Sequence, residues 1–500
     1  FGSSDSSVGA TASFSEASAM AANVGGTIRS HLVRFLGGPD RVLREVFRVV
    51  EARGDVEHVR TLVGGSSPQI WTRSWADEQH DPQLLWESAE HGAPDGRSPL
   101  MCALLATPRH LLLAGLRRRP QALRQLARQA PGSLAGISAR RALSAGADAC
   151  WGEVARLALG EWRAGVAIAL LEAGGGDLAT LADNANRTAL HYSAWAGDAH
   201  VAAALVRAGA DASALDRWSR SPAHVAAARG HAELAEDLAV RSPVTAVRPD
   251  AFGHTVAGIL SLSSRSTIAE KERSSLSWTE LFNDFVALSR PVLVRGGCAH
   301  LPAMSSWAEP QRLAAKLGAA ELSAGPVPYA PGCTGVSLPD FLASAEAAPP
   351  SAEARGPRHY AFDASVAGRC SELLADADLV APGRRAEVAA YVRQPQFGLG
   401  FRAAGAPMHL HHAALNALFV GSKRWLLLRP EASFWVREPS SAWAASAHCA
   451  ALRERGELLE LRQHAGDLLF VPEGWGHATV LEEYSVGVGQ EFIPLSSPSS

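Results

Sequence analysis

The pattern of apolar positions divides the chain into two regions that differ in the spacing of their apolar residues. From about residue 40 to residue 262, apolar side chains recur at helical spacing, for example over 42–50 and 111–116, and this spacing predicts amphipathic helices. Beyond residue 277 they gather into short runs bounded by glycine, proline or polar turns, which is typical of strands. Because 500 residues exceed what one hydrophobic core accommodates, we expect at least two domains, an all-α one followed by a mainly-β one.

The expected strands share a length of a few residues and a dense apolar content. They are found at 291–296, 391–392, 417–420, 425–428, 468–472 and 485–488. Many short strands bounded by glycine, proline or polar turns predict a sandwich or jelly roll over residues 278–495. The polar stretch 263–277 is the expected linker, and the Ser-, Ala- and Gly-rich residues 1–40 are expected to be disordered.

The helical region contains an internal repeat. The phrase Arg187–Ala194 returns 33 residues later as Arg220–Ala227, and a shorter third copy begins at Gly253. This period, with an opening similar to T-P-L-H-x-A, resembles ankyrin repeats. The clearest repeats are 187–219 and 220–252 within a predicted ankyrin region at 41–262. Further degenerate repeats are expected upstream, because about three stacked repeats are needed to bury a continuous core.

The repeat histidines, His191 and His224, have a structural explanation. Each follows a Thr or Ser that can cap the first helix of its repeat, and its ring can bond across the turn to the next repeat. Gly197 and Gly230 are placed to end those first helices. We therefore do not expect metal ligation by these two histidines.

Composition excludes several classes of function. The net charge of −3 offers no general attraction for nucleic acid or an anionic membrane, and the arginine run at 117–119 is expected to form the solvated face of a helix. No apolar run reaches the ~18–20 residues of a membrane span. The six cysteines form no close pairs, which fits a reducing compartment. Because the sequence starts at Phe1, we expect a fragment or a processed product, without a visible targeting signal.

Three histidines in the mainly-β region are candidate metal ligands. In the segment Gly405–His412, alternation on a strand would point His409 and His411 to the same face. A second segment, Gly466–Thr479, has an apolar strand that ends at a proline, and a Gly-rich loop then presents His477. The sequence predicts that His409, His411 and His477 hold one metal ion inside the barrel.

Several motifs in this region occur in the order found in one family. They are Pro407-Met408-His409-Leu410-His411, Gly421-Ser422-Lys423-Arg424-Trp425, Gly466–His477, Arg290–Gly296, Leu338–Leu342, Tyr360–Asp363 and Val488–Phe492. Together they resemble the jumonji-C (JmjC) family of iron(II)- and 2-oxoglutarate-dependent oxygenases over about 278–493. The resemblance implies a double-stranded β-helix of the jelly-roll or cupin type. It also implies Fe(II) as cofactor, 2-oxoglutarate as co-substrate and Lys423 as the residue that binds the distal carboxylate of 2-oxoglutarate.

The resemblance has three departures. His411 stands where the family usually has a carboxylate, Ala406 replaces a hydroxyl residue, and Asn416 lies one place later than the usual asparagine. Two histidines and one carboxylate are the ligand set of non-haem iron(II) oxygenases, whereas three imidazoles also suit zinc. A His-x-His pair also occurs in JmjC proteins resembling the small single-domain eighth type, so it is a recurring variant.

Three functions remain open on these residues. The first is a JmjC dioxygenase that hydroxylates or demethylates a protein side chain, with ankyrin repeats that recruit a protein partner. The second is an inactive cupin scaffold filled by a metal other than iron and joined to an ankyrin interaction module. The third is a three-histidine cupin enzyme that does not use 2-oxoglutarate. A cytoplasmic or nuclear location is expected, because ankyrin repeats favour both compartments.

Overall fold

The computed structural model describes residues 99–104, most of 164–346, 360–363, 370–380 and most of 389–495. The described residues fall into two compact units. The repeat unit contains residues 155–227 and 231–257, and the barrel unit contains Gly258–Ser500 with Ala228–Gly230. The predicted disorder at 1–40, the arginine run at 117–119 and most of the expected degenerate repeats lie outside the described residues. Within the described residues no helix is long and apolar enough to cross a membrane.

Short helices make up the repeat region. They are α6 (Pro99–Leu104), α11 (Ala189–Ala196), α12 (Ala199–Arg207), α13 (Pro222–Ala228), α14 (Ala232–Arg241), α15 (Pro243–Ala246) and α16 (Val256–Ser263). The pairs α11–α12 and α13–α14 are the helices of the two predicted repeats. Gly197 ends α11 in the left-handed conformation, with φ of 71°, as predicted for a helix C-terminus.

An aspartate-centred turn precedes each copy of the repeated phrase. Asp183, Asp216 and Asp250 each accept backbone N–H groups two and four residues later. In the first two turns the carboxylate also forms a buried ion pair with the arginine four residues on, Arg187 or Arg220. The three turns follow one another at intervals of 33 and 34 residues. The sequence reasoning found the phrase that follows each turn but not these aspartates.

The strands of the barrel unit are mostly antiparallel. They are β1 (Ala269–Glu272), β2 (Val292–Arg295), β3 (Glu321–Gly325), β4 (Thr334–Ser337), β5 (Tyr360–Asp363), β6 (Ala389–Val392), β7 (Gln396–Gly400), β8 (Ala413–Val420), β9 (Ser422–Leu428), β10 (Leu458–His464), β11 (Leu468–Val471), β12 (Gly476–Leu481) and β13 (Ser485–Pro494). The helices are η6 (Arg273–Ser275), α17 (Trp278–Leu281), η7 (Phe282–Val286), α18 (Ala303–Ser306), α19 (Pro310–Leu317), α20 (Leu338–Glu346), α22 (Ser371–Ala377), η9 (Pro430–Ala432), α24 (Ser440–Ala444) and α25 (Ala447–Glu454).

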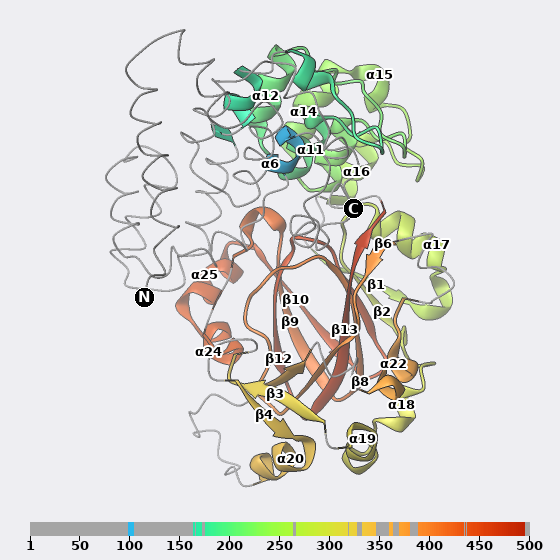
Figure 1. The fold of residues 1–500 in the computed structure, drawn as a ribbon, viewed down its shortest axis with the longest axis vertical. Helices are drawn as coiled ribbons and strands as arrows, with labels where there is room; N and C mark the ends of the chain where they lie inside the picture. Colours follow the sequence, from blue (N-terminus) through green and yellow to red (C-terminus); the bar gives the residue numbers. More distant parts are fainter. Residues whose placement is uncertain are drawn as a thin grey trace, which may run out of the picture. The chain divides into compact units, whose positions relative to one another are not determined.

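These strands form two sheets (Figure 1). The larger has ten strands in the order β1-β2-β11-β8-β13-β7-β5-β3-β4, with β6 paired to β13, and the smaller has the order β10-β9-β12. From β8 to β13 the chain passes repeatedly between the two sheets. This β-rich, two-sheet architecture is consistent with the predicted jelly roll.

Helices cover the outer faces of both sheets. Residues of η7, α18, α19, α20 and α22 pack with β7, β8 and β13 in one apolar cluster on the larger sheet. Residues of α24 and α25 pack with β9 and β12 in another cluster on the smaller sheet. A third cluster, with Trp425, Leu427 and Leu469, lies between the sheets. The alternate positions of β9 and β12 therefore face the inside, among them Lys423 and His477.

Two local expectations differ from the structure. Part of the expected linker forms β1, which pairs in parallel with β2 through Ala269 and Val292; β1 is a polar, largely exposed edge strand, so its sequence resembles that of a loop. The residues Gly421 and Ser422, between two apolar runs, predict a hairpin turn, but β8 and β9 belong to different sheets. Gly421, with φ of 82°, instead turns the chain from one sheet to the other.

Candidate metal centre

His409, His411 and His477 come together at one point of the barrel unit. Their candidate ligand nitrogens all lie within 4.8 Å of one another. The ring centroids are 4.2 Å apart for His409 and His477 and 4.6 Å apart for His411 and His477. Among the described residues, these three histidines form the group of His, Cys, Asp or Glu side chains that lie close enough together to hold one metal ion.

Backbone carbonyls fix the orientation of all three rings. The Nδ1 atom of His409 lies 2.8 Å from the carbonyl oxygen of Pro407, and that of His411 lies 2.6 Å from the carbonyl oxygen of His412. The Nδ1 atom of His477 lies 2.9 Å from the carbonyl oxygen of Trp475. Because a carbonyl oxygen only accepts, each Nδ1 carries a proton, and Nε2 is the ring nitrogen placed to bind a cation. Metal-binding histidines are commonly oriented in this way.

The spacing of two of the ring nitrogens suits a shared metal ion. Nε2 of His411 and Nε2 of His477 are 3.1 Å apart. Two nitrogens that each lie ~2.0–2.1 Å from one ion are roughly 3.0–3.4 Å apart at ordinary coordination angles. The donor set therefore fits a divalent metal ion.

The two segments that bear the histidines are held together by backbone hydrogen bonds. The N–H of His409 donates to the carbonyl of His477, and the N–H of His477 donates to the carbonyl of His409, with distances of 3.0 and 2.8 Å. His477 begins β12, but His409 forms only an isolated bridge and His411 lies in a loop. The predicted strand over 405–412 is therefore wrong. Pro407 lacks an N–H and Gly405 has φ of 149°, so a regular ladder does not form there.

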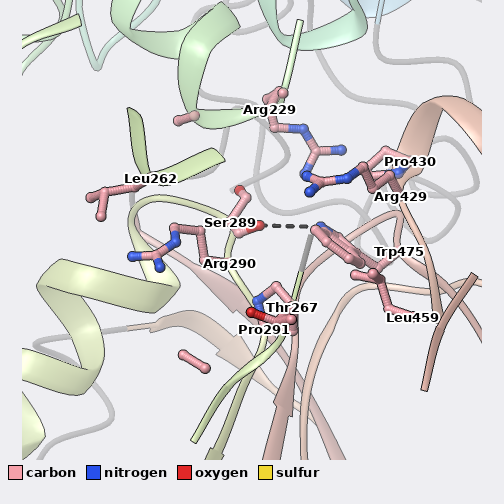
Figure 2. Close-up of a pocket in the computed structure, with 13 residues that line it drawn as sticks. Arg229, Leu262, Thr267, Ser289, Arg290, Pro291, Arg429, Pro430, Leu459 and Trp475 are labelled. Atoms are coloured by element: carbon pink, nitrogen blue, oxygen red, sulfur yellow. Dashed lines mark hydrogen bonds between the residues drawn. The ribbon is translucent and has the colours of Figure 1, made fainter. Parts of the chain in front are cut away.

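The loop that carries His477 is anchored on both sides. The indole Nε1 of Trp475 donates to the carbonyl of Ser289 at 3.1 Å, as Figure 2 shows. The N–H of Gly476 donates to Oγ of Ser433 at 2.6 Å, and the N–H of Gly474 donates to the carbonyl of His411 at 3.1 Å. Trp475 thus fixes the loop whose carbonyl orients His477.

Burial keeps two of the rings neutral. Burial, assisted by the neighbouring His411, lowers the pKa of His409 to about 4. Burial together with His409 and His411 lowers the pKa of His477 well below its ordinary value. Metal ligation requires unprotonated imidazole, so these two rings can bind a cation at neutral pH without releasing a proton.

Lys423 is a buried cation on the same inner face. Its side chain lies over the ring of Trp425, with Nζ 5.1 Å from the ring centroid, and the residue is 6% exposed. No carboxylate pairs with it among the residues that the structure describes, and burial lowers its pKa to about 8. A buried ammonium without a counter-ion is costly, so the position suits an anionic ligand.

Other polar groups of the interior were missed by sequence reasoning. Tyr360 packs with Ala404 and Leu481, and Ala406 adjoins this cluster. Oγ1 of Thr479 accepts the N–H of Ala406 at 3.0 Å. Hydroxyl groups therefore lie near the position where Ala406 departs from the family pattern, and strand alternation in β12 could have indicated Thr479.

The neighbouring polar residues have other surroundings. His412 lies 3.5 Å from the carboxylate of Glu473 and is not part of the three-histidine cluster. Nδ2 of Asn416 is buried without a hydrogen-bond partner. Glu491 of β13 and Gln396 of β7, joined by a 2.8 Å hydrogen bond, are two further buried groups that sequence reasoning did not single out.

The barrel unit is a β-rich, two-sheet structure with three histidines that could hold a metal ion, and comparisons with known proteins indicate its class. The family model "Ankyrin repeat" matches residues 185–217. Human JmjC domain-containing protein 8 is 33% identical over 92 residues, which are 18% of this chain and 34% of that protein. These matches confirm both resemblances drawn from the sequence: the chain carries ankyrin repeat sequence and a JmjC-like domain.

Two further relatives have named activities. The Arabidopsis thaliana arginine-specific demethylase JMJ22 is 24% identical over 251 residues, or 44% of this chain and 45% of that protein. The Caenorhabditis elegans bifunctional arginine demethylase and lysyl-hydroxylase psr-1 is 27% identical over 119 residues, or 20% of this chain and 30% of that protein. The chain thus spans between about a third and a half of the length of these curated relatives.

Proposed function

We propose that this protein is an iron(II)- and 2-oxoglutarate-dependent dioxygenase that hydroxylates, or hydroxylates and thereby demethylates, a protein side chain. The observation that carries the proposal is the convergence of the three histidines on the inner face that also carries the buried Lys423. In this proposal the oxygenase domain spans 278–495, and β1 from the expected linker 263–277 joins its larger sheet. The ankyrin region at 41–262 forms an all-α array that recruits a protein partner.

His409, His411 and His477 would hold the iron in this proposal. When bound with 2-oxoglutarate and oxygen, iron(II) supplies an oxidation in which one oxygen atom enters a substrate C–H bond while 2-oxoglutarate is converted to succinate and carbon dioxide. The protein contributes rings that are already oriented by carbonyl groups, which lowers the cost of assembling the site. Of the two outcomes, we favour stable hydroxylation.

Lys423 would bind the distal carboxylate of 2-oxoglutarate. On β9 it lies four residues from Leu427, which is the partner of His477 in the neighbouring strand, so the two positions are separated by roughly 13 Å along the strand. That spacing leaves room for a five-carbon dicarboxylate between the ammonium group and the histidines. The hydroxyl of Tyr360 would supply a donor that Ala406 cannot.

A turnover assay tests the proposal. Protein loaded with iron under anaerobic conditions and then given 2-oxoglutarate and air is expected to release succinate, and the His477→Ala variant is expected to release none. A wild-type protein that has bound one equivalent of iron but releases no more succinate than His477→Ala would refute the oxygenase. The variant His411→Asp restores the usual carboxylate, and increased turnover would show that His411 limits the reaction.

A second candidate follows from His411 itself. Three neutral imidazoles bind zinc, and the ordinary affinity order ranks iron(II) below zinc. The barrel unit would then be a zinc-filled scaffold, and the ankyrin surface would carry the function. Zinc in the purified protein together with no succinate release after exchange to iron would favour this candidate.

A further inference from the structure

Glu491 is a buried carboxylate on the strand next to the metal centre. In β13 it pairs with Ala414 of β8. Ala414 lies three residues after His411 in the sequence. Val488 and Phe492 of the same strand belong to the outer apolar cluster. Because side chains alternate along a strand, Glu491 points to the opposite face, into the barrel. The residue is only 7% exposed.

The carboxylate of Glu491 is incompletely bonded. Oε1 accepts a hydrogen bond of 2.8 Å from Nε2 of Gln396, which also points inward from β7. Oε2 is buried and has no hydrogen-bond partner, although Nη1 of Arg393 lies 3.6 Å from it. A buried anion needs compensation for its lost hydration, and Oε2 has only the ion pair with Arg393 for this.

The charge of Glu491 acts on the candidate metal ligands. Burial opposes its ionisation, but the electrostatic effects of His411 and Arg393 outweigh this and keep the pKa of Glu491 below its usual value. Glu491 lies outside the group of ligand atoms that are within 4.8 Å of one another, so it reaches the site through space.

We propose that Glu491 is a positioning residue that supplies, from β13, the negative charge that the site lacks because position 411 is a histidine. This inference rests on the proposed function only in that the three histidines bind a divalent cation. The usual carboxylate ligand lowers the charge of a metal centre by one unit. Here the carboxylate of Glu491 would supply that negative charge without being a ligand itself. The cation would in turn compensate the charge on its Oε2 atom. Gln396 would hold the carboxylate in place.

Metal affinity tests the proposal, with cobalt(II) or zinc alone as the probe and no turnover involved. Glu491→Gln keeps the size of the side chain and can still bond to Gln396, but it removes the charge. We expect cobalt(II) to bind at least tenfold more weakly to this variant than to wild type, and Glu491→Asp to recover a large part of the affinity. Asp363→Asn, at a carboxylate of β5 that is 6% exposed, is the matched control and is expected to change the affinity less than twofold.

A merely structural role for Glu491 predicts a different set of results. If the carboxylate only stabilises the fold, Glu491→Gln lowers the melting temperature of the metal-free protein and leaves the affinity for cobalt(II) unchanged. If it compensates the metal charge, the melting temperature of the metal-free variant stays the same or rises, because an incompletely bonded buried charge is gone.

The variant His411→Asp completes the experiment as a double-mutant cycle. With a carboxylate already at position 411, the charge of Glu491 matters less, so Glu491→Gln is expected to cost under threefold in that background. Equal losses of affinity in both backgrounds, or a loss below twofold in the wild-type background, would overturn the inference while leaving the proposed function intact. No metal binding by the wild-type protein would overturn both.

Discussion

The histidines of the repeat unit and those of the barrel unit differ in the backbone groups that face Nδ1. His191 accepts the N–H of Thr188 at Nδ1, at 3.1 Å, and its Nε2 lies 3.0 Å from the carbonyl of Arg220. His224 repeats this with Ser221 and Arg248. In contrast, Nδ1 of His409, His411 and His477 faces a backbone carbonyl. All five rings are at least partly buried, so burial alone does not separate a structural histidine from a ligand.

The difference lies in which nitrogen carries the proton. In the repeats a backbone N–H needs an acceptor, so Nδ1 is unprotonated. The proton is on Nε2, which donates to a carbonyl of the next repeat. In the barrel unit three carbonyls need a donor, so Nδ1 is protonated and Nε2 is the nitrogen available to a metal ion. The backbone groups around a histidine therefore determine whether its ring can bind a metal ion.

The largest effect is expected from removing one barrel histidine. His477→Ala should weaken the binding of cobalt(II) or zinc at least 100-fold, because the ion loses one of three ligands. His464→Ala, at an exposed histidine of β10, is the matched control and should leave the affinity unchanged. Titration of the metal-free proteins measures both. Similar metal affinities for wild type and His477→Ala would show that His477 is not a metal ligand, and the distinction between the two sets of histidines would not hold.

The next effect concerns the buried cation of the barrel unit. Lys423→Met should weaken the binding of 2-oxoglutarate about 30- to 100-fold, since a charge-assisted hydrogen bond contributes ~2–3 kcal/mol. The metal-free variant should melt at the same or a higher temperature, because an uncompensated buried charge is lost. Lys271→Met, at an exposed lysine of β1, controls for net charge. An unchanged dissociation constant of 2-oxoglutarate would exclude Lys423 from the binding site.

A repeat histidine should have the opposite phenotype. His191→Ala leaves the buried N–H of Thr188 without its acceptor and removes one of the hydrogen bonds to the carbonyl of Arg220, which should destabilise the repeats by about 2–4 kcal/mol. Metal affinity should not change. Denaturant unfolding compares this variant with His200→Ala, whose histidine is exposed on α12. A stability equal to that of His200→Ala would show that the bonds of His191 contribute little.

The smallest effect is a dependence of the repeats on pH. Burial lowers the pKa of both His191 and His224 below the ordinary histidine value of 6.5, so the unfolded chain binds protons that the folded repeats do not. Their contribution to stability is therefore complete above about pH 6.5 and decreases as the pH falls through the lower folded pKa values. Hydrogen exchange over 187–252, corrected for intrinsic rates, should show protection that weakens in that range. Protection that does not change between pH 7.5 and 5 would contradict this.

Much of the fold could be predicted from periodicity and punctuation, and the exceptions have local causes. The 33-residue phrase located α11 and α13 because each repeat needs the same cap and the same glycine. The segment at 405–412 was wrongly predicted as a strand, because alternation of histidines says nothing about whether Pro407 permits a ladder. The glycine at 421 signals a turn, but it does not reveal that the strands on either side belong to different sheets.

The candidate site was predictable to the extent that its residues are close in sequence to motifs. His409, His411 and His477 were found from two segments, and the structure brings them together. Glu491 and Gln396 were not found, because they reach the site from β13 and β7. Alternation along β13 indicates that Gly487, Gly489 and Glu491 share a face. Only the pairing of β13 with β8 shows that this face is the inner one.

The metal ligands of the loaded protein provide the most direct test of the central claim, that three Nε2 atoms bind one ion. X-ray absorption spectroscopy of protein carrying one equivalent of zinc is predicted to show three imidazole ligands with Zn–N distances of ~2.0–2.1 Å, and two in His477→Ala. A spectrum without imidazole scattering, or one that is the same in wild type and His477→Ala, would contradict the account.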